Sequence, residues 1–278
     1  MAYAHEATRK RPAPVGSDAI AGCTATGFLK VIALVFMFID HAGKMVFSSY
    51  PEMRMLGRIA FPLYCWCMVV GISYTHSVPR YLLRIALIGL ISQPLYMVAL
   101  NHTVLTPNIF LTLFIALCAV WGIREKKLLS HIWAPILALC AAQVLGCDYG
   151  WRGVMLVMLL YGVRNSRAGI ACVMVAYCLF WGSSSSQITS AFGIDLTGLI
   201  ASPIGSVLSP WLRMQALAVL ALPLMLLPTS AHIKMPRLLS YSLYPLHLVL
   251  LIALEAFFGL TIHTEQLVNA WNALIALF

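Results

Sequence analysis

Ionisable side chains lie inside apolar stretches near the start of this chain. Asp40 and His41 belong to a long apolar run, Lys44 follows one helical turn later, and Arg58 stands at the head of the next run. Ionisable groups at membrane depth cost free energy and usually mark a functional site. A neutral imidazole can serve there as a general base or as a nucleophile, and a guanidinium can stabilise a developing negative charge.

Each of these side chains also has a purely structural interpretation. Asp40 and Lys44, at positions i and i+4 of one helix, could simply neutralise each other. Arg58 could extend its guanidinium to the outer lipid phosphates. His247, in the last long apolar run, could be a hydrogen-bonding group between two helices. The catalytic interpretation therefore requires that several of these groups meet.

Distances along the helices predict such a meeting. With a rise of 1.5 Å per residue, His41 lies about 20 Å and His247 about 14 Å from the inner ends of their helices. Both positions are near the middle of a hydrocarbon core of about 30 Å. Asp148 and Tyr149 precede a glycine that opens a helix, and Glu255 lies near the outer end of the last long run. We predict that these three bind substrate, although Asp148 could pair with a neighbouring arginine and Glu255 could be solvated at the interface.

The composition identifies an integral membrane protein. Of 278 residues, 61% are hydrophobic and 10% are charged, with a mean hydropathy of +0.89, whereas soluble domains carry roughly 25% charged residues. The net charge of +9 is spread over short loops, so it favours membrane orientation over nucleic-acid binding. The eight cysteines lie mostly in apolar runs without zinc-ligand spacing, so we expect no metal site.

The apolar runs predict an all-α, polytopic transmembrane helix bundle. We expect about nine spans, with eight to ten possible, preceded by a polar tail at 1–27 and followed by an amphipathic segment at 261–278; residues 28–260 form a single domain. Residues 183–210 could be an outer loop, a re-entrant segment or a broken helix. The predicted spans are 28–47, 57–76, 81–100, 108–123, 130–146, 151–163, 168–182, 211–228 and 238–259.

The distribution of basic residues predicts the orientation. With the N-terminus in the cytosol, 13 of the 18 Lys and Arg residues fall on the cytosolic side. Cytosolic loops of membrane proteins carry such an excess. We therefore expect a cytosolic N-terminus.

Four stretches of the chain resemble the TraX family of membrane proteins. They are Leu29-Lys30 leading to Asp40-His41, Gly57 to Leu63 (Gly-Arg-Ile-Ala-Phe-Pro-Leu), Asp148-Tyr149-Gly150 with Gly153, and Tyr244 to Leu248 (Tyr-Pro-Leu-His-Leu). The family is best known for N-terminal acetylation of conjugative pilin. The resemblance implies a multi-pass protein of the inner (cytoplasmic) membrane that moves an acetyl group from cytosolic acetyl-CoA to an acceptor amine or hydroxyl at the outer side, with a pilin N-terminus as the implied acceptor. The implied catalytic residues are His41, Asp40, Arg58 and His247.

The basic residues of the cytosolic loops are candidates for binding the anionic nucleotide end of acetyl-CoA. Orientation alone would also explain them, and the sequence contains no glycine-rich phosphate loop. The residues are Arg80, Arg84, Arg124, Lys126 and Lys127.

Two other functions compete with the acetyltransferase. A proton-coupled transporter could use Asp40, His41, His247 and Glu255 as a relay, although we find no two-fold repeat of interrupted helices. A non-catalytic assembly factor for a conjugation or secretion machine would need none of this chemistry. The partners expected for the enzyme are acetyl-CoA, a pilin or other extracytoplasmic acceptor, and membrane lipid, with no nucleic acid.

Overall fold

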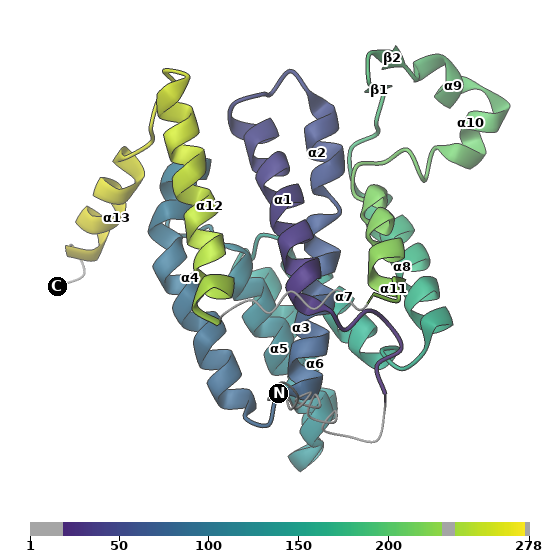
Figure 1. Cartoon of the computed structure of the whole chain (residues 1–278), viewed down its shortest axis with the longest axis vertical. Helices are drawn as coiled ribbons and strands as arrows, with labels where there is room; N and C mark the ends of the chain where they lie inside the picture. Colours follow the sequence, from purple (N-terminus) through teal and green to yellow (C-terminus); the bar gives the residue numbers. More distant parts are fainter. Residues whose placement is uncertain (1–18, 230–236, 276–278) are drawn as a thin grey trace, which may run out of the picture.

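The computed structural model describes residues 19–229 and 237–275, and these form a mostly helical bundle (Figure 1). Within these residues, four helices are long and apolar enough to cross a membrane: Thr26–Met45, Pro51–Tyr74, Val78–Leu100 and Lys127–Val144. The all-α membrane class is therefore supported, while the count of nine spans stays a prediction. The main helices are α1 (Thr26–Met45), α3 (Ala60–Tyr74), α4 (Val78–Leu100), α5 (Ile109–Glu125), α6 (Ser130–Val144), α7 (Gly150–Gly162), α8 (Arg167–Gly182) and α12 (Arg237–Phe257).

Helix α3 forms the centre of the bundle. It is apolar on all sides, as a helix buried within a larger bundle must be, and Phe61, Leu63 and Trp66 are at most 1% exposed. The short helix α2 (Pro51–Gly57) precedes it, and Arg58 and Ile59 form the turn between the two. The predicted span 57–76 therefore begins with a break at the glycine-arginine pair rather than with a continuous helix.

The residues directly before α1 pack against the bundle. Cys23 and Ala25 are buried, and the Cys23 N–H donates to the carbonyl of Met225 at 2.7 Å. The Trp66 indole N–H donates to the Cys23 carbonyl at 2.8 Å. The end of the predicted polar tail is thus part of the packed structure, while residues 1–18 lie outside the described residues.

The segment from 183 to 226 is the most irregular part of the fold. It holds a two-stranded antiparallel hairpin, β1 (Ser190–Ala191) and β2 (Ile194–Asp195), and the short helices α9 (Thr197–Ala201) and α10 (Pro203–Leu208). A 3₁₀ helix, η2 (Ala216–Ala221), and α11 (Leu222–Leu226) follow. The predicted span 211–228 is therefore a shorter helix than expected, because the backbone around Leu212 and Met214 instead pairs with residues 186–188.

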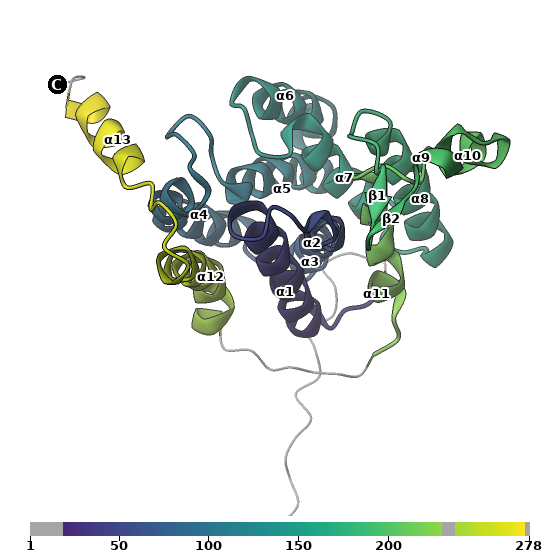
Figure 2. The ribbon, with the colours of Figure 1, turned by 90° about the horizontal axis from the view of Figure 1, so that it is seen from above.

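The C-terminal elements follow the expected pattern. Helix α12 covers the predicted last span, with Pro245 inside it. After it, α13 (Glu265–Ile275) is a helix within the segment predicted to be amphipathic, 261–278, and it extends from the edge of the bundle (Figure 2). Residues 276–278 lie outside the described residues.

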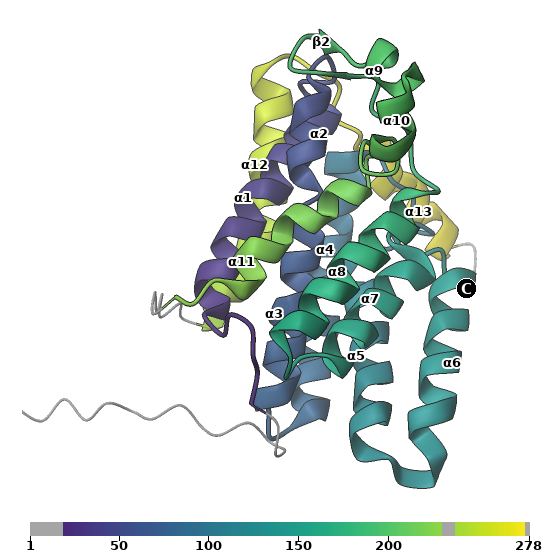
Figure 3. The same ribbon diagram turned by 90° about the vertical axis from the view of Figure 1, so that its right-hand side faces the viewer.

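The two ends of the bundle carry different features. The β1–β2 hairpin and the α1–α2 connection lie at one end, called here the hairpin end, and the α5–α6 connection with the 3₁₀ turn η1 (Lys127–Leu129) lies at the other (Figure 3). In the predicted orientation the hairpin end faces outward.

Candidate functional site

A cavity of about 400 Å³ opens among the helices on the side of the hairpin end. A small inward extension shares Asp40, His41, Tyr96, Asp148 and Tyr149 with it. The sequence segments that meet here are separated by more than 150 positions, so only the tertiary fold assembles the site. The residues that line the main cavity are Asp40, His41, Lys44, Arg54, Arg58, Tyr96, Leu100, His102, Gln143, Asp148, Tyr149, Gly150, Trp151, Arg152, Trp181 and Gln215.

The two predicted histidines are in contact. His41 Nδ1 lies 3.2 Å from His247 Nε2, and their rings stack with centroids 5.4 Å apart. The other ring nitrogen of His247, Nδ1, forms a short hydrogen bond to the backbone carbonyl of Tyr244, one turn earlier on α12. Because a carbonyl only accepts, His247 Nδ1 must carry the hydrogen of that bond.

This hydrogen bond assigns the tautomers along the pair. A neutral His247 that carries its hydrogen on Nδ1 presents a lone pair on Nε2, so His41 must donate from Nδ1. The free lone pair of a neutral His41 is then on Nε2, which has no hydrogen-bond partner among the described residues. His41 lines the cavity, and the pair thus holds one imidazole in the form that a general base or nucleophile requires.

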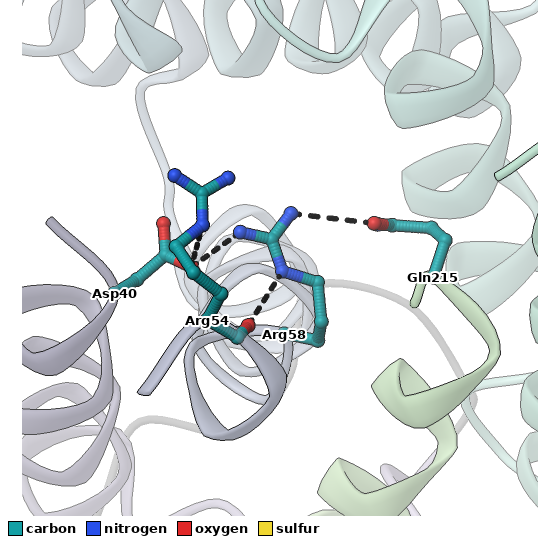
Figure 4. A network of polar contacts seen from close by, with 4 residues as sticks. All are labelled: Asp40, Arg54, Arg58 and Gln215. Atoms are coloured by element: carbon teal, nitrogen blue, oxygen red, sulfur yellow. Dashed lines mark hydrogen bonds and ion pairs between the residues drawn. The ribbon is translucent and has the colours of Figure 1, made fainter. Parts of the chain in front are cut away.

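Asp40 forms an ion pair with Arg58 rather than a contact with His41 (Figure 4). The Arg58 terminal nitrogen Nη2 donates to Asp40 Oδ1, and Arg54 Nε lies 3.5 Å from the same oxygen. Successive residues of a helix point about 100° apart, so Asp40 faces α2 while His41 faces α12. Asp40 therefore does not orient the His41 imidazole; His247 has that position instead.

Arg58 is held at three of its nitrogens. Its Nε donates to the Arg54 carbonyl at 3.1 Å, and Nη1 donates to Gln215 Oε1 at 3.4 Å, in addition to the Asp40 contact. Each terminal nitrogen keeps a second N–H. The guanidinium is therefore fixed in place while it can still donate to a group in the cavity, and lipid phosphates are not needed to explain it.

Gly57 permits the close approach that forms this ion pair. A Cβ at position 57 would lie 2.2 Å from the Asp40 Cβ and 2.3 Å from its Oδ1. Real Cβ atoms do not come closer than about 3.0 Å to other heavy atoms. The glycine before Arg58 is thus required because α1 and α2 touch at Asp40.

The Asp148-Tyr149 stretch forms the wall opposite α1. Tyr149 stacks on Phe61, with ring centroids 3.7 Å apart, and Gly153 leaves room for both rings. The surrounding protein excludes water from the Asp148 carboxylate and raises its pKa, while the nearby Lys44 and Arg58 charges oppose that shift. Asp148 forms no ion pair with Arg152 among the described residues, and Arg152 lies instead over the Trp151 ring at 5.1 Å.

Lys44 contacts a histidine that the sequence did not point to. Its Nζ lies 3.2 Å from His102 Nε2, and His102 stacks on Tyr96 with centroids 5.0 Å apart. A lysine ammonium at this distance requires a neutral His102 that accepts through Nε2, and burial together with Lys44 lowers the His102 pKa. Lys44 therefore contacts His102, whereas Asp40 is neutralised by Arg58 and Arg54.

The predicted substrate residue Glu255 lies outside the cavity. Its side chain is buried on α12, and one carboxylate oxygen has no partner among the described residues. Glu255 lies further along α12 than His247, and it is not among the residues that line the cavity.

The basic residues predicted to hold acetyl-CoA lie at the other end of the bundle. Arg80 is 16 positions before the cavity residue Tyr96 on α4, or about 24 Å along the helix axis. Arg124 donates to the carbonyls of Ile72 and Thr75 at 2.9 and 3.2 Å, so it ties two helix ends together. None of the five predicted residues, Arg80, Arg84, Arg124, Lys126 and Lys127, lines the cavity.

Several cavity residues were not selected as site residues from the sequence. Arg54 has no motif around it, and Arg152 lies between the motif residues Gly150 and Gly153. His102 and Gln215 come from connections whose position depends on the fold. Lys44 was noted only as an ionisable group. Across the part of the chain that the structure describes, no group of three or more His, Cys, Asp or Glu side chains could hold a metal ion.

The family model for the TraX protein matches residues 25–255 of this chain. The protein belongs to the TraX family. The match includes both residues of the histidine pair and both residues of the Asp40–Arg58 ion pair.

Two curated proteins are similar to this TraX-family chain. One is a probable fimbrial assembly protein FimC, serogroup H1, of Dichelobacter nodosus, 31% identical over 146 residues, which are 48% of this chain and 59% of the relative. The other is an uncharacterized protein of Rickettsia prowazekii (strain Madrid E), 32% identical over 170 residues, 59% of this chain and 64% of the relative. The chain thus spans about three fifths of each relative. No solved structure matches it.

Proposed function

We propose that this protein is an integral membrane acyltransferase of the inner membrane. It transfers an acetyl group from cytosolic acetyl-CoA to an amine or hydroxyl acceptor at the outer side, and the family resemblance favours a pilin N-terminus as that acceptor. The observation that carries the proposal is the hydrogen-bonded chain from the Tyr244 carbonyl through His247 to His41, because it leaves one basic nitrogen at a polar cavity.

His41 has the central role in this proposal. Its Nε2 accepts the proton of the acceptor amine or hydroxyl as that group attacks the thioester carbon, or Nε2 attacks that carbon itself and then passes the acetyl group to the acceptor. In either route the carbon–sulfur bond breaks, and coenzyme A leaves as its thiol after taking up the proton that the acceptor has lost. The positive charge that then develops on His41 is shared through the Nδ1–H bond to His247, whose own Nδ1–H is fixed by the Tyr244 carbonyl. His247 is thus a positioning residue for the catalytic imidazole.

Arg58, which Asp40 holds in place, stabilises the negative charge that develops on the substrate during the reaction. Acyl transfer places a negative charge on the former carbonyl oxygen, and a fixed donor stabilises it most when it needs no reorganisation. Asp40, Gln215 and the Arg54 carbonyl hold the Arg58 guanidinium in place. The unused N–H groups of Arg58 supply the stabilisation.

The acyl donor has to reach His41 from the cytosolic side of the membrane. The basic residues first predicted for it lie at the far end of the bundle, about 24 Å from the cavity along α4. The donor would have to extend along the bundle from that end to reach His41. Arg124 already binds two backbone carbonyls, which favours a structural role for it.

Labelled acetyl-CoA tests the proposal. The purified full chain in detergent should transfer the label to an amine acceptor or release it as acetate, and His41→Ala should abolish both. Absence of transfer and hydrolysis by folded wild-type protein would refute it. That result would favour a non-catalytic role in pilus assembly, which the name of the Dichelobacter relative also suggests.

A further inference from the structure

The main cavity carries more positive charge than its own carboxylates neutralise. Four cationic side chains line it, Lys44, Arg54, Arg58 and Arg152, against two carboxylates, Asp40 and Asp148. The structure pairs Asp40 with Arg58 and Arg54. The two histidines that line the cavity, His41 and His102, are neutral in the hydrogen-bonding arrangement described above. The four cationic side chains then exceed the two carboxylates by two positive charges. Unpaired charges inside a protein are costly, so a cavity of this kind is stabilised when an anion enters it.

The Arg152 side chain is the clearest sign of a missing partner. Its Nε is buried and has no hydrogen-bond partner among the described residues. Its guanidinium lies over the ring of Trp151, 5.1 Å from the ring centroid, and both residues line the cavity. A buried donor without a partner costs the full free energy of its lost hydration. Arg152 also lines the cavity, so an acceptor oxygen bound there can pair with its guanidinium.

The start of α7 adds a second donor surface to the same wall. Tyr149, Gly150, Trp151 and Arg152 all line the cavity, and no side chain caps this helix end. The first N–H groups of a helix have no acceptor within the helix, and the helix dipole places partial positive charge there. Lys44, whose Nζ lies 3.2 Å from His102 Nε2, lines the same cavity.

We propose that Lys44, Arg152 and the first turn of α7 form a binding site for an anionic group of a substrate, a carboxylate or a phosphate. The site lies in the same cavity as His41, so it would hold one end of the substrate while the reacting group faces the imidazole. This inference rests on the proposed function and adds the chemistry of the substrate. The anion is either a phosphate of the acyl donor or an acidic group of the acceptor.

Inorganic phosphate is the first probe. Its affinity for the purified full chain in detergent is measured by thermal stabilisation at constant ionic strength, because salt alone screens charges. We expect saturable binding, and Lys44→Gln or Arg152→Gln should each raise the Kd about tenfold or more, as loss of a charged hydrogen bond does. Lys44→Arg keeps the charge and should stay within about threefold of wild type.

Arg167→Gln is the matched control for charge removal. Arg167 lies outside the cavity and donates to the Leu226 carbonyl at 2.7 Å, so its loss should leave the Kd unchanged. Equal weakening in Arg167→Gln and Lys44→Gln, or stabilisation that does not saturate, would overturn the proposal.

Two competitors identify the source of the anion. Adenosine 3′,5′-bisphosphate carries donor-type phosphates without a thioester, and a short peptide with glutamate at its second position carries an acidic acceptor group. Displacement of phosphate by the first supports the donor, and displacement by the second but not by its glutamine counterpart supports the acceptor. If neither competitor displaces the bound phosphate, that phosphate is an adventitious ion only, and the inference is overturned. None of these measurements needs acetyl transfer, so failure here and failure of the proposed function remain distinguishable.

Discussion

Replacement of Gly57 by alanine should separate the contribution of helix contact from that of the catalytic groups. The new Cβ would lie 2.2 Å from the Asp40 Cβ, whereas ordinary contact begins at 3.4 Å, so α1 and α2 must move apart by about 1.2 Å. Both atoms are attached directly to backbone, so a side-chain rotation cannot relieve the clash. Overpacking of this kind costs about 1–3 kcal/mol, and the higher helix propensity of alanine returns up to about 1 kcal/mol.

The effect on activity should exceed the effect on stability. The displaced residue, Asp40, holds Arg58, and the helix it belongs to carries His41. A misplacement of about 1 Å in a catalytic arrangement can reduce the rate about 10²-fold. We therefore expect Gly57→Ala to remain folded, with a net loss of about 0–2 kcal/mol, and to be about 10²-fold slower in single-turnover acetyl transfer.

Gly162→Ala provides the matched control. A Cβ at position 162 would meet nothing within 4 Å, so this variant should be as active as wild type and as stable or slightly more so. Thermal unfolding in detergent and single-turnover transfer are measured for both variants. Wild-type activity and stability in Gly57→Ala would refute the claim that helix contact at Asp40 aligns the site.

The remaining predictions concern the histidines, a carboxylate and the orientation. His41→Ala should abolish transfer, whereas His247→Ala should lose about 10²-fold or less because it removes only orientation of the base; equal losses in rate would assign His247 a direct role. The raised Asp148 pKa means that the folded state binds the proton more tightly than the unfolded state, so its stabilising contribution is complete below the unfolded pKa and disappears as the pH rises through the folded one. Asp148→Asn should therefore flatten the plot of Tm against pH across that window, and an unchanged slope would contradict this reasoning. For orientation, cysteine at Phe192, which is 75% exposed, should react with an impermeant thiol reagent from outside intact cells, while cysteine at Leu128, 93% exposed at the opposite end, should not; the reverse pattern would invert the predicted topology.

Two native cysteines, Cys147 and Cys23, are unsuitable for that labelling experiment. The predicted topology places Cys147 outside, in the loop between the spans 130–146 and 151–163. It does lie in the connection before α7, but it is only 6% exposed, and Cys23 is only 4% exposed. Burial blocks a thiol reagent on either side of the membrane, and introduced cysteines at exposed positions avoid this problem.

Much of the architecture could be predicted because the bilayer imposes its own pattern on a sequence. A span must be long, apolar and helical, since no water is present to satisfy free backbone groups. The helices α1, α4 and α12 accordingly lie where the apolar runs begin and end. The segment 183–226 could not be predicted in this way, because its backbone groups pair across the chain, as between Ile188 and Leu212. Such pairing leaves no periodic pattern in the sequence.

The sequence by itself determined which residue types are placed at membrane depth, and it indicated that His41, Asp40, Arg58 and His247 belong to one site. Tertiary structure decided which of them touch. Asp40 and His41 are neighbours in the chain, but the helix turns them toward different partners, Arg58 on one side and His247 on the other. Lys44 and Arg152, which both line the cavity, come from elements more than 100 positions apart. Rotation about a helix axis and the packing of distant helices cannot be read from spacing alone, and those two factors determine how the ionisable groups of this protein pair.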